Sequence, residues 1–188
     1  MRNLEMTALL CALLLSSCAY QMGIGSRSLP GGYRQLAIPV FSNKTQEVGA
    51  EVAFTNAMIR EFEQSQIAEI VPVDNAPLKL EGEIESVKYG SRSAAQSKEI
   101  PALPQNAVLT TSYQILVTMR FRLRRVSDQA VLWEGSVNNE KVYSAPQIGT
   151  PVVNSANVLY NQSARQQSLT ALAKEMMEEA HDRMTENF

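Results

Sequence analysis

The sequence contains few residues that could cross-link the chain, bind a metal or catalyse a reaction. Its 188 residues include two cysteines, Cys11 and Cys18, and one histidine, His181. Metal sites need clustered Cys, His or carboxylate ligands, and hydrolases need a nucleophile beside a base. No serine lies in a nucleophile-elbow pattern, and no glycine-rich phosphate loop is present. We therefore expect neither an enzyme nor a protein with a metal or cofactor, and we place His181 on the solvent side of the last helix.

The chain also lacks an excess of charge of either sign. Its net charge is −2, with 17 basic and 19 acidic residues, so no overall positive field exists to hold nucleic acid. A hydrophobic content of 45% and a charged content of 19% are typical of a globular protein. After Leu15 no apolar run is long enough to cross a membrane.

The first residues have the organisation of a signal peptide. Arg2 precedes a short apolar stretch from Met6 to Leu15, and the small residues Ser16 and Ser17 lead to Cys18. This pattern resembles a bacterial lipobox, which implies cleavage after residue 17 and attachment of an S-diacylglycerol and an N-acyl chain to Cys18. Residues 1–17 are then a lipoprotein signal peptide. The alternative is an ordinary secreted protein with a cysteine near its cleavage site by chance.

Beyond the signal peptide, the pattern predicts a tether followed by one domain. Residues 18–33 are rich in Gly, Ser and Pro, which favours a flexible tether. Residues 34–188 predict an α+β domain, a two-layer sandwich in which two helices cover one face of a four- to five-stranded mixed sheet. The expected order is strand 36–41, helix 48–64, strand 67–73, strand 78–89, loop 90–110, hairpin strands 113–126 and 130–143, loop 144–154 and helix 155–185.

The first three of these elements form a βαβ unit, so their two strands should be parallel. In the later strands, polar and apolar side chains alternate. In strand 113–126 the apolar side chains point to the core, and in the last helix Leu169, Leu172, Met176 and Ala180 form an apolar stripe with Asn154 or Ser155 as its N-cap.

Alternation also predicts two stripes of charge on the outer face of the sheet. Arg120, Arg122 and Arg124 share one stripe, and a neighbouring strand carries Glu81, Glu83 and Glu85. One interpretation is that these groups pair across strands, which contributes about 0.2–1 kcal/mol for each exposed pair. The other is that the guanidinium groups bind phosphates, which arginine contacts through two nitrogen atoms. The sequence leaves both interpretations open.

Several short motifs resemble the LptE family of lipopolysaccharide-assembly lipoproteins. They are Leu29-Pro30, Ile38-Pro39-Val40-Phe41, Asn43-Lys44-Thr45 and the acidic segment Glu47–Glu51. The order of elements is also similar, and the resemblance covers essentially the whole mature chain, with its most specific part at residues 29–51.

The resemblance implies a lipid-anchored protein of the outer membrane that faces the periplasm. Its partners would be an LptD-like β-barrel, which it plugs and helps to assemble, and lipopolysaccharide, which it helps to deliver to the outer leaflet. Ala19 after Cys18 fits sorting to the outer membrane. No binding residues are carried over from the family, so Arg120, Arg122 and Arg124 are our own candidates for contact with lipopolysaccharide phosphates. The alternative function is a periplasm-facing regulatory lipoprotein that binds and activates a cell-wall synthase; a periplasmic hydrolase is disfavoured by the missing nucleophile–base pair.

Overall fold

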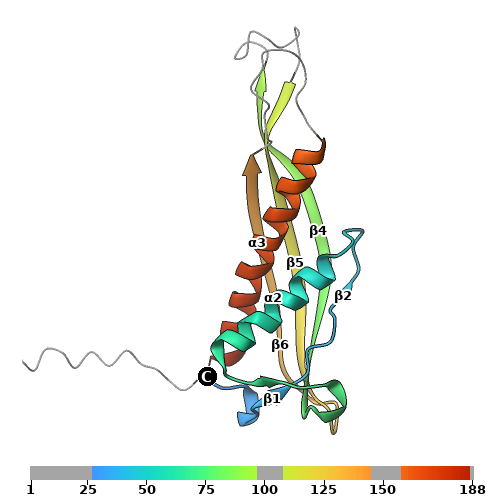
Figure 1. Cartoon of the computed structure of the whole chain (residues 1–188), viewed down its shortest axis with the longest axis vertical. Helices are drawn as coiled ribbons and strands as arrows, with labels where there is room; N and C mark the ends of the chain where they lie inside the picture. Colours follow the sequence, from blue (N-terminus) through green and yellow to red (C-terminus); the bar gives the residue numbers. More distant parts are fainter. Residues whose placement is uncertain (1–26, 97–107, 145–157, 187–188) are drawn as a thin grey trace, which may run out of the picture.

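The computed structural model describes residues 27–96, 108–144 and 158–186. A four-stranded sheet forms its largest element (Figure 1), in the order β2 (Ser42–Asn43), β4 (Leu78–Gln96), β5 (Val108–Arg125) and β6 (Val131–Ser144). β2 is parallel to β4, whereas β4, β5 and β6 are antiparallel neighbours. The predicted mixed sheet is therefore confirmed.

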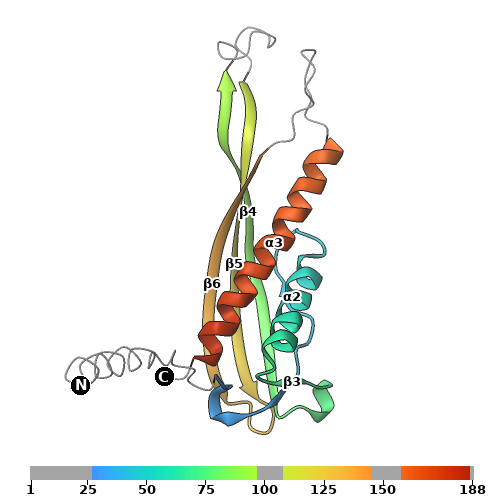
Figure 2. The ribbon, with the colours of Figure 1, turned by 60° about the vertical axis from the view of Figure 1, so that its left-hand side comes forward.

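Two helices, α2 (Ala50–Ser65) and α3 (Val158–Thr185), lie on the same face of this sheet (Figures 1 and 2). The sequence favours both helices because apolar side chains recur every three or four residues. The α2 side chains Phe54, Met58 and Phe62 are fully buried, and so is the predicted stripe on α3. None of the helices in the described parts of the chain is long and apolar enough to span a bilayer.

The core lies between the helices and the inner face of the sheet. On β5 every second residue points into it, as the alternation predicts, and each of these side chains is fully buried: Ile115, Val117, Met119, Phe121 and Leu123. On β6 the alternation is less regular, because the register shifts between Leu123 and Arg124. Val131, which pairs with Arg124 beyond this shift, is for this reason 45% exposed.

Phe121 is packed between two glycines on the neighbouring strands. It stands opposite Gly82 on β4 and Gly135 on β6. A Cβ atom at Gly82 would come within 2.6 Å of the Phe41 ring, and one at Gly135 within 2.6 Å of the Trp133 ring. The absent side chains therefore leave room for two aromatic rings beside Phe121, and the Phe41 and Phe121 rings meet edge to face with 5.8 Å between centroids.

The predicted βαβ unit is present, in a modified form. β1 (Gln35–Leu36) and β3 (Glu69–Ile70) are parallel, as expected, but they form a separate two-stranded sheet. A single bridge between Ala37 and Lys79 joins this pair to β4. The expected strand 36–41 is interrupted at Pro39, which has no N–H to donate to a ladder, and the chain returns to the sheet only at β2.

Several predicted segments have different bounds in the structure. The expected loop 90–110 is wrong at both ends, because β4 continues to Gln96 and β5 begins at Val108; residues 97–107 lie outside the described residues. The predicted tether 18–33 is too long: Leu29 is 1% exposed in the core, and Pro30–Gly32 form the 3-10 turn η2. The predicted loop 144–154 begins one residue too early, because Ser144 is the last residue of β6. The predicted signal peptide, Cys18, residues 145–154 and the N-cap of the last helix lie outside the described residues.

Candidate functional site

The outer face of the sheet carries the predicted charges. Arg120, Arg122 and Arg124 lie on β5, and each points away from the helices because its neighbours in sequence point into the core. The register places Glu81 opposite Arg122 and Glu83 opposite Arg120. The structure thus brings both predicted stripes together on one surface.

Each of the three arginines contacts a carboxylate. The Nε atom of Arg120 is 3.0 Å from Glu85, that of Arg122 is 3.0 Å from Glu134 on β6, and that of Arg124 is 3.0 Å from Glu81. Arg120 and Arg122 remain 46% and 39% exposed. Arg120 and Arg124 therefore pair with the predicted acidic stripe, whereas Arg122 pairs with β6 instead. The pairing leaves the guanidinium groups accessible from the solvent.

Two lysines extend the paired surface toward β2. Lys79 lies 2.9 Å from Glu81, and Lys44 lies 2.7 Å from Glu83. The hydrogen bond from Lys79 and the nearby Arg124 charge lower the pKa of Glu81, and the hydrogen bond from Lys44 lowers the pKa of Glu83. These carboxylates are ionised at neutral pH, so the outer face alternates in charge.

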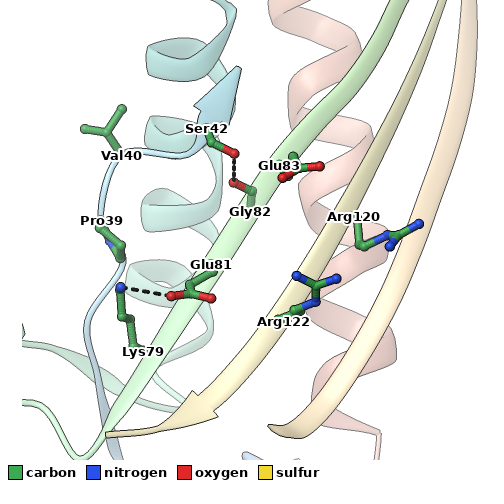
Figure 3. Close-up of a pocket in the computed structure, with 9 residues that line it drawn as sticks. All are labelled: Pro39, Val40, Ser42, Lys79, Glu81, Gly82, Glu83, Arg120 and Arg122. Atoms are coloured by element: carbon green, nitrogen blue, oxygen red, sulfur yellow. Dashed lines mark hydrogen bonds and ion pairs between the residues drawn. The ribbon is translucent and has the colours of Figure 1, made fainter. Parts of the chain in front are cut away.

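A hollow of about 300 Å³ opens on this face beside the interrupted edge strand (Figure 3). Pro39 and Val40 form one side, and Arg120 and Arg122 form the opposite side. The hollow exists because the chain leaves the β4 edge between Ala37 and Ser42, where Pro39 breaks the ladder. Val40 is 66% exposed there, so apolar and charged groups adjoin on one surface.

Asn43 organises the connection between β2 and α2. Its side-chain oxygen accepts hydrogen bonds from the backbone N–H and the hydroxyl of Thr45, at 2.9 and 2.8 Å. Its amide nitrogen donates to the Glu47 carbonyl at 2.7 Å and to the Glu51 carboxylate at 2.8 Å. The hydrogen bond from Asn43 is the main reason that the pKa of Glu51 is lowered. The motif Asn43-Lys44-Thr45 therefore has a structural role that its sequence alone does not reveal.

This connection places Glu47 on the helix side of the sheet, in a cluster with Arg165 and Tyr89. Glu47 forms an ion pair with Arg165 of α3, and the Arg165 guanidinium lies 4.1 Å from the centre of the Tyr89 ring. Burial, assisted by a hydrogen bond to Glu47, raises the pKa of Tyr89 to about 12. Sequence reasoning missed this cluster, because Glu47 and Arg165 are far apart in the chain and neither belongs to a motif that predicts their contact.

His181 is buried, which corrects its predicted position on the solvent side of α3. It is 1% exposed, its ring meets the Phe62 ring edge to face, and its Nε2 atom is 2.9 Å from the Ser65 hydroxyl. Its Nδ1 atom is 3.4 Å from Asp182, a carboxylate that also accepts a hydrogen bond from Arg27 at 2.5 Å. The contact between Ser65 and His181 joins the C-terminal ends of α2 and α3. In the last turn of a helix the free backbone groups are carbonyls rather than N–H groups, so the backbone beside Ser65 does not form an oxyanion hole.

His181 should make the stability of the fold depend on pH. Burial lowers its pKa below the ordinary value of about 6.5. As the pH falls below about 6.5, His181 becomes protonated in the unfolded chain but stays neutral in the folded chain. The free energy of unfolding is therefore highest above pH 6.5 and decreases as the pH falls below it. Urea midpoints should fall between pH 7.5 and 5.5 for the wild type and stay nearly level for His181→Gln. His181 is the only histidine, so equal slopes in the two proteins would contradict this assignment.

The part of the chain that the structure describes contains no group of three or more His, Cys, Asp or Glu residues that could hold a metal ion. The outer face itself presents guanidinium, ammonium and carboxylate groups, which make ionic contacts and hydrogen bonds.

The family can now be assigned. A model of the family described as "LptE: Lipopolysaccharide-assembly" matches residues 33–187, which include both sheets and both helices. The chain belongs to the LptE family. It is therefore a lipopolysaccharide-assembly lipoprotein of the cell envelope, from a family of assembly proteins rather than enzymes. The match confirms the resemblance over residues 33–51 and extends it to the last helix, whereas the Leu29-Pro30 motif lies before the matched residues.

Other comparisons add little to the LptE assignment. No curated protein matches the chain. Among solved structures, a PelC dodecamer variant from Paraburkholderia phytofirmans is 16% identical, with 86% of this chain and 92% of that chain covered and a TM-score of 0.47. Rare lipoprotein B from Shewanella oneidensis is 15% identical (80% and 90% covered, TM-score 0.42), and a lipoprotein from Caulobacter crescentus is 11% identical (78% and 88% covered, TM-score 0.46). We base no functional argument on similarities of this size.

Proposed function

We propose that this chain is the outer-membrane lipoprotein that plugs an LptD-like β-barrel, assists its assembly and helps to deliver lipopolysaccharide to the outer leaflet. The observation that carries the proposal is the LptE family match over residues 33–187. In this proposal the protein faces the periplasm and is not an enzyme. It uses no cofactor beyond the N-acyl and S-diacylglycerol groups on Cys18.

The shape and surface of the domain support this proposal. β4 has 19 residues, which corresponds to roughly 60 Å at about 3.3 Å per residue. Such a length exceeds the hydrocarbon thickness of a bilayer, about 30 Å. The outer face of the sheet carries ion-paired charges of β4, β5 and β6, which suits contact with a water-lined lumen.

Purification of the tagged lipoprotein from solubilised outer membranes tests the proposal. We expect one β-barrel protein of larger mass to co-purify, and depletion of the lipoprotein should mislocalise lipopolysaccharide. Recovery of a cell-wall synthase in place of a barrel would instead support the regulatory alternative. Absence of a barrel from the purified material would contradict the plug.

The lipid anchor gives a separate prediction. Cys18→Ser removes the acylated sulfur, and each methylene that no longer inserts into the bilayer forfeits about 0.8 kcal/mol. The variant should leave the membrane fraction almost completely, as measured by fractionation and by mass spectrometry of the processed N-terminus. Cys11→Ser is the matched control and should fractionate as the wild type does. A Cys18→Ser variant that is cleaved normally and stays with membranes would refute the lipobox.

A further inference from the structure

The far end of the β4–β5 hairpin has neither a third strand nor a helix against it within the described residues. β6 ends at Ser144, which pairs with Ser112, and β2 pairs with β4 only at Glu83 and Ile84. Past Ser93, which pairs with Ser112, β4 and β5 continue as a two-stranded ribbon that projects beyond β6 (Figure 2). Before that point, from Ser86 to Ser93, β4 is the edge strand of a sheet formed with β5 and β6. The side chains of Lys88 and of residues 91–94 are exposed, whereas Tyr89 is 39% exposed and contacts Arg165 of α3.

Such a ribbon is at most marginally stable in water when it stands alone, because three strands or a packed helix are needed to bury a face. Here the pairing nevertheless extends to Gln96 opposite Val108. A third strand would stabilise the ribbon by satisfying main-chain groups along its free side.

The free side of β4 is the longer of the two open edges. It runs from Ser86 to Gln96, whereas the free side of β5 covers only residues 108–111. From Gly90 to Ala95, β4 consists of small residues apart from one arginine, Arg92, which donates hydrogen bonds to Gln114 and Glu140. These side chains leave room for another main chain to approach the edge.

The charge of this edge indicates what kind of segment it would accept. Residues 86–96 contain two basic residues and no acidic residue. Arg92 is paired with Glu140, but the exposed Lys88 has no carboxylate partner among the described residues. A carboxylate on an incoming strand would supply one.

We propose that the β4 edge from Ser86 to Gln96 accepts an extended segment of the barrel partner as a further strand, with a carboxylate of that segment beside Lys88. This inference rests on the proposed function, because the barrel partner provides the strand. It adds main-chain pairing to the polar contacts expected inside a lumen.

Amide hydrogen exchange, compared between the free lipoprotein and its purified complex with the barrel, tests the pairing. We expect amides between Tyr89 and Gln96 to exchange at least tenfold more slowly in the complex. Unchanged exchange in an intact complex would overturn the strand addition while leaving the plug in place. If no complex forms, the proposed function fails, and this inference fails with it.

Two charge variants and a crosslinking experiment test whether the segment bound at the β4 edge belongs to the barrel. Lys88→Glu should lower the amount of co-purified barrel at least fivefold. Lys174→Glu, the same charge change on an exposed residue of α3, should not lower it. A photo-crosslinking residue at Ser93 should give an adduct with the mass of chain plus barrel. An adduct of two copies of this chain, or equal effects of the two lysine variants, would contradict the proposal.

Discussion

Replacing Phe121 with alanine is expected to lower the free energy of unfolding by about 3–5 kcal/mol. The ring is fully buried and meets the Phe41 ring edge to face. Its strand neighbours Gly82 and Gly135 have no side chains that could fill the space left behind. The cavity would therefore remain, and its cost adds to the lost burial of the ring.

Urea denaturation followed by far-ultraviolet circular dichroism measures this loss. Val131→Ala is the control, because Val131 is 45% exposed on a neighbouring strand and should change stability by less than about 0.5 kcal/mol. Domains of this size are stable by only about 5–15 kcal/mol, so Phe121→Leu provides a milder variant if the alanine variant does not fold. A loss below about 1 kcal/mol for Phe121→Ala would show that Phe121 does not organise the core.

The double variant Arg120→Glu with Arg122→Glu is expected to weaken lipopolysaccharide binding at least tenfold. Hydrogen bonds to charged groups contribute about 1.5–3 kcal/mol each, and about 1.4 kcal/mol corresponds to a factor of ten in affinity. Both guanidinium groups are accessible beside the hollow on the outer face. The measurement is the affinity of the solubilised full-length lipoprotein for immobilised lipopolysaccharide.

The control for this experiment is Arg60→Glu with Lys174→Glu, which makes the same charge change on the helix side of the molecule. It should bind lipopolysaccharide as the wild type does. Circular dichroism must show that both double variants are folded. If the folded Arg120/Arg122 variant binds lipopolysaccharide as the wild type does, these two arginines only form ion pairs with Glu85 and Glu134 and do not contact the ligand.

Local patterns determined which side of each long element faces the core. On β5 the alternation of apolar residues with Arg120, Arg122 and Arg124 predicted the inner and outer faces correctly. The stripe on α3 was also correct. Both predictions succeed because burial in a strand or helix repeats with the period of the backbone itself, so a short stretch of sequence contains the signal.

Composition was a poorer guide to where β4 ends. Residues 90–96 are rich in Gly, Ser and Ala and favour a loop, but they form a strand paired with β5. Ladder hydrogen bonds are made by the main chain, so a long hairpin can continue through residues whose side chains bury nothing. For the same reason, the open edge at this end of β4 could not be predicted from the side chains.

The sequence by itself determined the α+β class, the charged outer face, the LptE resemblance and the expected lipid site at Cys18. Only the tertiary structure decided which distant residues meet. His181 is buried because Phe62 and Ser65 of α2 pack on it, Gly82 and Gly135 leave space for the rings of Phe41 and Trp133, and Glu47 reaches Arg165. These contacts depend on how elements far apart in the chain pack together, and the periodicity of one segment carries no information about its partner in another.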